Sequence, residues 1–217
     1  MKDKRLFMTV IMWVLYVLWL LFFASVQLTI GNVIGHLLFL VIIVILNFEE
    51  LKSEYEKFKT DKKKISKILL YALGLFVVMQ VGNVIVSIIS EAYEVDSSSQ
   101  TIFSLFEIVP LGTMFVAFTM IMFYPVVEEL IFRKSLKAII TNNVFFVIFS
   151  SLIIWYFQVT LINPNISEFI FSFPTFLVML YLSFIYVKKN NIIYTITTRI
   201  IYNVVILIIQ VIGLILR

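Results

Sequence analysis

Long runs of apolar residues alternate with short polar segments along this chain. A helix that crosses the hydrocarbon core of a membrane needs about 20 apolar residues. Seven runs approach or exceed that length, and helices are expected at 6–28, 33–48, 68–90, 112–137, 144–161, 169–187 and 192–216. The pattern predicts an all-α, polytopic membrane helix bundle. It forms a single transmembrane domain over residues 1–217 and shows no internal repeat.

The polar segments between these runs carry most of the charge and predict how the bundle is oriented. Residues 49–67 are rich in Lys and Glu and are expected to form a solvated loop, although their lysines could instead contact anionic lipid. Residues 91–101 and 163–168 predict acidic or polar loops, and residues 188–191 a basic turn. Because Lys and Arg are enriched in cytoplasmic loops, the alternation places the N-terminus in the cytoplasm.

Composition agrees with a membrane protein. Of the 217 residues 62% are hydrophobic and only 14% are charged, with a mean hydropathy of +1.07, whereas soluble domains carry about a quarter charged residues. The net charge of +4 is modest, and the basic residues cluster near the ends of the predicted spans. This arrangement favours membrane lipid as a partner and argues against nucleic acid. The abundance of Phe, Ile and Lys is typical of an AT-rich genome and favours a bacterial cell membrane.

Four charged residues fall inside predicted spans, where ionised groups are rare. They are Glu128, Glu129, Arg133 and Arg199. Each would cost about 2.5–3.5 kcal/mol at the bilayer centre if it were unpaired, so they are expected to face the bundle interior and to pair. Glu129 and Arg133 have the i, i+4 spacing of one helix face. The charges could form a functional site, or a buried ion network that only holds the helices together.

The residues around these charges resemble a known family. Tyr124 to Ser135 reads YPVVEELIFRKS, which is similar to the Glu-Glu-x-x-x-Arg motif of the CPBP family of CAAX proteases and bacteriocin-processing enzymes, also called Abi. The resemblance covers about 112–205. The family's second motif, Phe-x-x-x-His, falls where this chain has Ile154 and Gln158. Its third, His-x-x-x-Asn/Asp, falls where this chain has Arg199 and Asn203.

The resemblance implies an intramembrane endopeptidase, in which a glutamate activates a water molecule and His and Asn side chains bind the oxyanion. Such chemistry needs a carboxylate base and fixed donors at the developing negative charge. Gln158, Arg199 and Asn203 could still donate. Carried onto this chain, the resemblance gives the candidate catalytic residues Glu128, Glu129, Arg133, Gln158, Arg199 and Asn203.

Charge balance argues against hydrolysis. Both motif histidines are replaced, and a second arginine beside the two glutamates makes the cluster roughly neutral. An arginine paired with a glutamate makes that carboxylate a weaker base, and arginine itself cannot accept a proton. We therefore favour a pseudoprotease that acts as a membrane partner, regulator or bacteriocin-immunity-type factor. The alternative is an active glutamate-dependent endopeptidase that processes a peptide or membrane-protein substrate, and a transporter or channel is the least favoured.

No cofactor or metal site is expected from the sequence. The chain has no cysteine and a single histidine, His36, far from the motifs, and two adjacent glutamates supply too few ligands for zinc. The aromatic residues of 145–157, and Trp13, Tyr16 and Trp19, predict packing or interface anchoring. The oligomeric state stays open.

Overall fold

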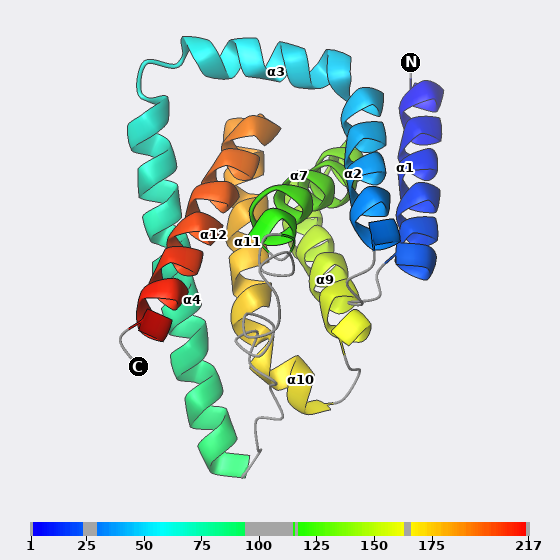
Figure 1. Ribbon diagram of the computed structural model, residues 1–217. Helices are drawn as coiled ribbons and strands as arrows, with labels where there is room; N and C mark the ends of the chain where they lie inside the picture. The colour runs from blue at the N-terminus through cyan, green and yellow to red at the C-terminus, as the bar shows by residue number, and fades with distance from the viewer. Residues whose placement is uncertain (1, 24–29, 94–114, 116, 163–165, 216–217) are drawn as a thin grey trace.

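The computed structural model describes residues 2–23, 30–93, 115, 117–162 and 166–215. Every regular element in these ranges is a helix (Figure 1), which confirms the all-α prediction. The elements are α1 (Lys2–Phe23), α2 (Ile30–Leu46), α3 (Phe48–Thr60), α4 (Lys64–Tyr93), the π-helical segment η1 (Thr119–Phe123), α7 (Tyr124–Glu128), the π-helical segment η2 (Glu129–Ser135), α8 (Leu136–Ile139), α9 (Asn143–Ile162), α10 (Ile166–Phe171), α11 (Phe173–Lys189) and α12 (Ile192–Ile215).

Two of the described helices are long and apolar enough to cross a membrane by themselves, over Lys64–Glu91 of α4 and Ile192–Gly213 of α12. A third crossing results if the bent pair α2 and α3 is counted as one span. Each of the seven predicted runs is helical over its described residues apart from single breaks at Asn47 and Ser172, but a count of seven spans is not confirmed. Apolar stretches such as Leu6–Phe22 and Asn143–Val159 are too short to pass the same test.

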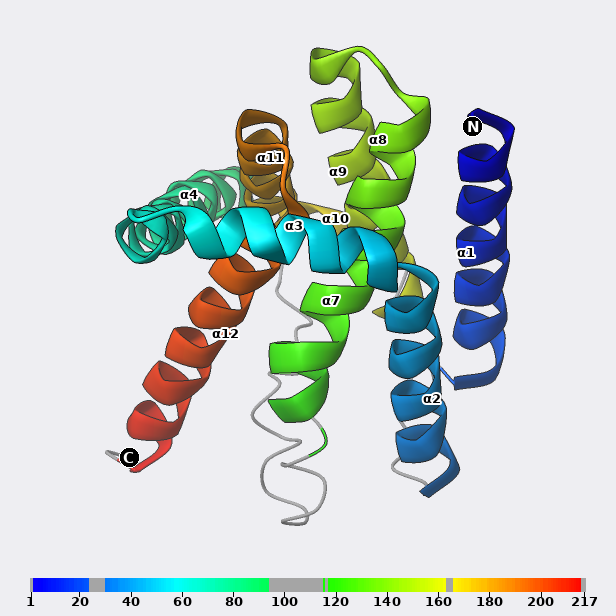
Figure 2. The ribbon, with the colours of Figure 1, turned by 90° about the horizontal axis from the view of Figure 1, so that it is seen from above.

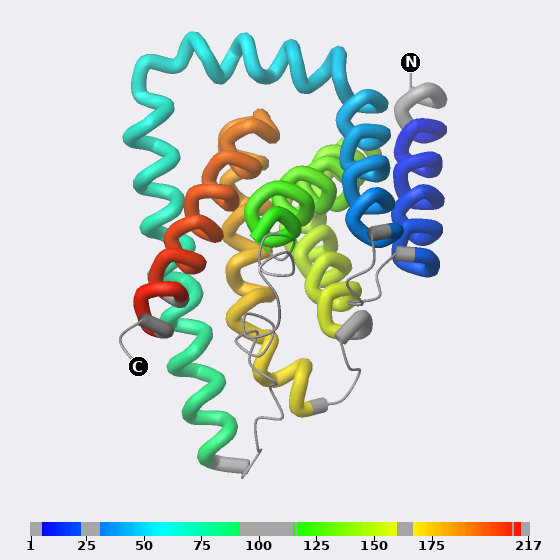
Figure 3. The backbone as a smooth tube through the Cα atoms, viewed as in Figure 1, coloured from blue at the N-terminus to red at the C-terminus, as the bar shows by residue number. Residues whose placement is uncertain are grey.

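The charged segment after α2 is a helix, which corrects the predicted loop. The chain turns by 74° between α2 and α3, as the tube in Figure 3 shows, and α3 crosses one end of the bundle to reach α4 (Figures 1 and 2). Its sequence FEELKSEYEKFKT carries charges on most positions and has no buried residue. Because charged side chains are costly in hydrocarbon, we place α3 at the membrane–water interface.

The turn between α11 and α12 forms where the sequence predicted one. Asn190 ends α11 with the left-handed φ of 48°, a conformation that Asn tolerates better than most residues. The next residue, Asn191, accepts a hydrogen bond from the backbone N–H of Ile193 at 2.9 Å and so caps α12. This turn lies at the same end of the bundle as α3 (Figure 1).

Helices α4 and α11 pack closely at a glycine. A Cβ atom added to Gly82 of α4 would lie 2.6 Å from the backbone Cα of Pro174, near the start of α11. The small residue lets the two helices approach, as small residues commonly do between membrane helices. Around this contact the core is formed by buried apolar residues of α1, α2, α4, the η1–α8 segment, α9, α11 and α12.

We expect Gly82→Ala to destabilise the bundle, because the added methyl group meets backbone that cannot rotate away. Overpacking of this kind costs about 1–3 kcal/mol, and the better helix propensity of alanine recovers at most about 1 kcal/mol. Thermal unfolding in detergent measures the change. Gly213→Ala is the matched control, because nothing lies within 4 Å of a Cβ atom there. Equal melting temperatures for the two variants would show that the α4–α11 contact is not tight.

Candidate functional site

The Glu-Glu-x-x-x-Arg sequence lies on a continuous helical segment, Thr119–Ile139, that switches between π and α geometry. Glu128 is the last residue of α7 and Glu129 is the first residue of η2. All residues from Val127 to Leu136 are buried, so the segment runs through the interior between neighbouring helices (Figure 2). Single π turns inside α-helices occur frequently at functional sites.

Two glutamates and two arginines meet in the interior as a buried charge quartet, which we define as Glu128, Glu129, Arg133 and Arg199. Arg133 pairs with Glu129 on the same helical segment, as the i, i+4 spacing predicted. Arg199 of α12 donates to Glu128 at 2.5 Å and lies 3.6 Å from Glu129. The four residues are at most 6% exposed. Two negative and two positive charges therefore compensate each other away from water.

Gln158, the residue at the second motif's histidine position, also binds Glu128. Its side-chain amide, projecting from α9, lies 3.1 Å from each of the two carboxylate oxygens. Glu128 is thus held by a neutral donor from α9 and a charged donor from α12. A charge-assisted hydrogen bond of this kind is stronger than a neutral one, so both partners restrict the carboxylate.

Arg133 is fixed by a second set of partners on α11. Its Nε donates to the hydroxyl of Ser183 at 3.1 Å, and its Nη2 donates to the carbonyl of Met179 at 3.1 Å. Ser183 in turn lies 3.0 and 3.1 Å from the hydroxyls of Ser150 and Ser151 on α9. Sequence reasoning missed these serines, although adjacent small polar residues in an apolar run are a known signal of helix contact in membranes.

Asn203 lies outside the quartet's contacts and supports the backbone of η1. Its side-chain amide donates to the carbonyl of Met120 at 2.6 Å. In this π-helical stretch the N–H of Tyr124 bonds to the carbonyl of Thr119, five residues earlier. The next donor in that series would be residue 125, which is a proline and has no N–H. Asn203 therefore supplies the hydrogen bond that Pro125 cannot make.

Aromatic residues of α1 cover the segment that bears the quartet. Trp13 and Tyr16 pack edge-on against Phe132, with ring centroids 4.9 and 5.0 Å apart. Both also contact the ring of Phe157, next to Gln158. Trp19 is buried among aromatic rings that include His36 at 5.1 Å. These residues pack in the core, in agreement with the packing expected of them.

Helix α3 contacts two of the elements that carry the quartet, η2 and α12, at one end of the bundle. Glu50 and Glu54 of α3 lie 3.2 and 3.3 Å from Nζ of Lys134, which directly follows Arg133 in the chain. Glu54 also accepts a hydrogen bond from the first backbone N–H of α12, that of Ile192, at 2.5 Å. Its own carbonyl accepts from Asn191 at 2.8 Å. One interfacial helix thus ties the η2 segment to α12, which carries Arg199.

Asp61, directly after the last residue of α3, binds side chains of α4 and α12. Its carboxylate accepts hydrogen bonds from Lys67 at 2.5 Å, from the hydroxyl of Tyr194 and from the backbone N–H of Lys63. The Lys67 hydrogen bond is the largest cause that lowers the pKa of Asp61, followed by those from Tyr194 and Lys63. The turn between α3 and α4 is therefore bound directly to α12.

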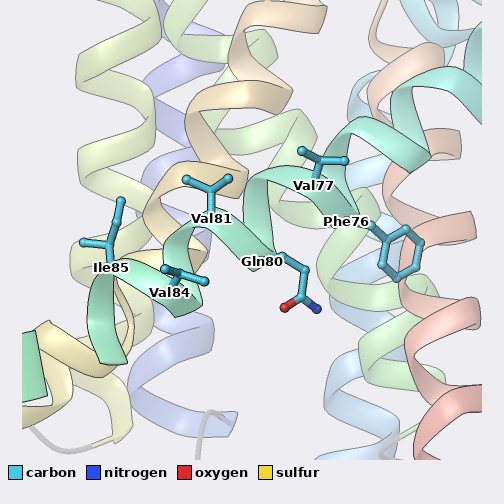
Figure 4. Close-up of a pocket in the computed structure, with 6 residues that line it drawn as sticks. All are labelled: Phe76, Val77, Gln80, Val81, Val84 and Ile85. Carbon is cyan, nitrogen blue, oxygen red and sulfur yellow. The ribbon is translucent and has the colours of Figure 1, made fainter. Parts of the chain in front are cut away.

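Two cavities of the described structure lie away from the quartet. One of about 470 Å³ is lined entirely by α4 residues, among them Phe76, Gln80 and Ile85 (Figure 4). Another of about 260 Å³ lies where α3, α4 and α12 meet. Neither is lined by a quartet residue. Among the residues that the structure describes, no group of His, Cys, Asp and Glu could hold a metal ion.

Comparison with known proteins assigns the region that contains the quartet. Residues 110–205 match the family model described as type II CAAX prenyl endopeptidase Rce1-like. This part of the chain is therefore similar to the type II CAAX prenyl endopeptidases of the CPBP family. The matched range agrees with the resemblance deduced from the motifs. Searches of curated proteins and of solved structures each found no match.

The structure brings together five of the six residues predicted from the CPBP motifs. Glu128, Glu129, Arg133, Gln158 and Arg199 contact one another, whereas Asn203 binds the backbone of Met120. Their catalytic roles stay a prediction. The apolar helices and the Rce1-like match support an integral membrane protein. The bacterial origin and the cytoplasmic N-terminus stay predictions too.

We expect the contribution of Asn203 to depend on Pro125. Asn203→Ala leaves a half-buried carbonyl without this donor and should destabilise the protein by about 1 kcal/mol. In a Pro125→Ala background the backbone N–H of residue 125 is restored, so the same Asn203→Ala change should cost less. Unfolding of the four proteins in a double-mutant cycle measures this coupling. If the two substitutions changed the free energy of unfolding additively, the side chain of Asn203 would not replace the missing N–H of Pro125.

We expect Asp61 to make stability depend on pH. Because its folded pKa lies below the unfolded value of about 3.9, its contribution is present above that value and is lost as the pH falls through the folded pKa. Wild type should melt at a higher temperature than Asp61→Asn at pH 7, and the gap should narrow below about pH 4. A gap that stays constant down to pH 3 would exclude the carboxylate as its source.

Proposed function

We propose that this CPBP-family chain is a pseudoprotease that acts as a non-catalytic membrane partner. It would bind a peptide or membrane protein as a regulator or as a bacteriocin-immunity-type factor. The observation that carries the proposal is the 2.5 Å hydrogen bond from Arg199 to Glu128. In the family pattern a histidine stands at this position and a carboxylate activates water. Here a permanent cation binds one of the two candidate carboxylates.

The charge of the quartet supports this proposal. A general base must take up a proton in the transition state. Arg199 donates to one oxygen of Glu128 at hydrogen-bond distance, so a charged donor occupies that oxygen where a base would hold its water molecule. Arg199 cannot take the proton instead, because arginine stays protonated in proteins. Glu129 shares the same arginine at 3.6 Å and is also paired with Arg133.

Two of the three side chains that could stabilise an oxyanion, the amides of Gln158 and Asn203, are engaged elsewhere. The side-chain amide of Gln158 points to Glu128, and that of Asn203 points to the carbonyl of Met120. Oxyanion stabilisation requires donors already directed at the position where negative charge develops. Redirecting either amide would break a half-buried hydrogen bond, and such a bond contributes about 0.5–1.5 kcal/mol.

An active glutamate-dependent endopeptidase is the second candidate, and one observation favours it. Oε2 of Glu129 is buried and has no hydrogen-bond partner among the described residues. This oxygen is the one carboxylate atom of the quartet that could bind and activate a water molecule without first losing a protein partner. If the chain hydrolyses peptides, Glu129 and not Glu128 is expected to be the base.

A cleavage assay separates the two candidates. We expect wild type in liposomes to cleave a fluorogenic prenylated CAAX peptide no faster than Glu129→Gln, because the quartet holds its carboxylates in ion pairs. Gln158→His combined with Arg199→His should raise the rate, since it removes the second positive charge and restores both histidines. An active CAAX endopeptidase serves as the positive control. Wild-type cleavage that Glu129→Gln abolishes, with the fold intact, would overturn the proposal.

The same variants distinguish a structural quartet from a catalytic one. Removing one partner of a buried ion pair commonly costs about 3–5 kcal/mol, so Glu128→Gln and Glu129→Gln should lower the melting temperature and the yield. Glu56→Gln, an exposed glutamate on α3, is the matched control and should have no effect. Co-purification followed by mass spectrometry should recover a membrane partner with wild type and Glu56→Gln. Normal stability of both quartet variants would contradict a structural role.

A further inference from the structure

An apolar groove lies beneath the turn between α3 and α4. The cavity of about 260 Å³ is bounded by Phe58 of α3, by Ile65 and Leu69 of α4, and by Ile201 of α12. Thr197 and Lys64, the first residue of α4, also line it, with the apolar parts of their side chains. The groove therefore runs between the starts of two helices long enough to cross a membrane, with a cation at one end.

The groove opens toward the surface that would face lipid. Ile65 and Leu69, on its α4 side, are 68% and 56% exposed. Leu70 and Leu73 continue this exposed apolar surface along α4, at 63% and 60%. A long apolar helix face of this kind is normal where acyl chains surround a protein. An elongated apolar molecule in the bilayer can thus enter the groove from the side.

A basic turn marks the end of the groove. Lys62 and Lys63 are exposed and directly precede Lys64, and Lys57 and Lys59 are exposed in the last turn of α3. Asp61, the acid in this run, is already bound by Lys67, Tyr194 and the backbone N–H of Lys63. Among the ion pairs of the described residues, Lys67 is the one lysine of 57–67 that meets a carboxylate. The turn therefore has a local excess of positive charge.

Lys64 connects the turn to the groove. Its Nζ donates to the carbonyl of Lys59 at 2.8 Å and lies 5.7 Å from the centroid of the Phe58 ring. Its aliphatic stem lines the apolar cavity while its ammonium group stays at the end of α3. Lysines near helix ends commonly bury their stems and hold their charge at the membrane interface in this way.

We propose that this groove binds an anionic phospholipid, with its phosphate at Lys62–Lys64 and one acyl chain between α4 and α12. A ligand of this site needs an apolar chain that fills the groove and a negatively charged head group that reaches the lysines. A phospholipid has both parts. A polar peptide would match the lysines but not the apolar groove. The site lies outside the quartet and does not depend on whether the chain is a protease.

A bound lipid would stabilise the contact between α3 and α12, the helix that carries Arg199 of the quartet. The phosphate would lie at Lys62–Lys64, in the turn that the hydrogen bond between Asp61 and Tyr194 joins to α12. The acyl chain would contact Phe58, which packs edge-on against Tyr194 with ring centroids 5.0 Å apart. A bound lipid would thus fill the groove where α3, α4 and α12 meet.

Tryptophan fluorescence with brominated lipids tests the proposal on the full chain. Leu69→Trp places a reporter in the groove, and the signal of the three native tryptophans is subtracted with wild type. In mixed vesicles, brominated phosphatidylglycerol should quench the reporter with about a 30- to 150-fold preference over brominated phosphatidylcholine, the range expected for two to three lysines. Lys62→Gln with Lys63→Gln and Lys64→Gln should abolish that preference.

Matched controls separate this site from general attraction to anionic membranes. Val84→Trp reports on the other groove of α4, where its lining includes no lysine, and should show no preference. Lys52→Gln with Lys137→Gln and Lys188→Gln removes the same charge elsewhere and should leave the Leu69→Trp signal unchanged. Ile65→Trp replaces Leu69→Trp if that variant does not fold. Equal quenching by both lipids, or displacement of phosphatidylglycerol by inorganic phosphate at constant ionic strength, would overturn the proposal.

Discussion

Compensation of charge in an apolar interior is the constraint on which this structure depends. An arginine or glutamate that is buried without a partner in a membrane costs several kcal/mol, and four such residues lie together here. The cost is reduced only if α7, η2 and α12 hold their charged side chains at hydrogen-bond distance. Gln158 from α9 and Ser183 from α11 complete the contacts. The buried charges thus fix the relative positions of the central helices.

This constraint also explains how the CPBP pattern is altered in this chain. Replacement of a neutral residue by Arg199 adds a charge to the interior, and its contact with Glu128 compensates it. Replacement of the other histidine position by Gln158 retains a donor to the same carboxylate. The substituted residues are therefore well accommodated by the fold. Their hydrogen bonds favour a stable ion network over groups that must exchange protons during a reaction.

The sequence allowed the helices and the pairing of Glu129 with Arg133 to be predicted, because both follow from local spacing. Apolar runs mark helices directly, and i, i+4 residues share a helix face. Helix α3 was predicted wrongly as a loop, since its charges obscured the three- and four-residue spacing of Leu51, Glu54 and Phe58. The π-helical geometry around Pro125 could not be foreseen, because it depends on Asn203 from a distant helix.

Helix α3 has a consequence for the order in which the chain assembles. It is synthesised early, but its acceptor Glu54 binds Asn191 and Ile192, which follow 137 and 138 residues later. Its contact with Lys134 likewise waits for the η2 segment. The first helices must therefore enter the membrane while the acidic face of α3 has no partner. The hydrogen bonds of α3 are complete only after the last helix has been inserted, so the docking of α3 marks the completion of the bundle.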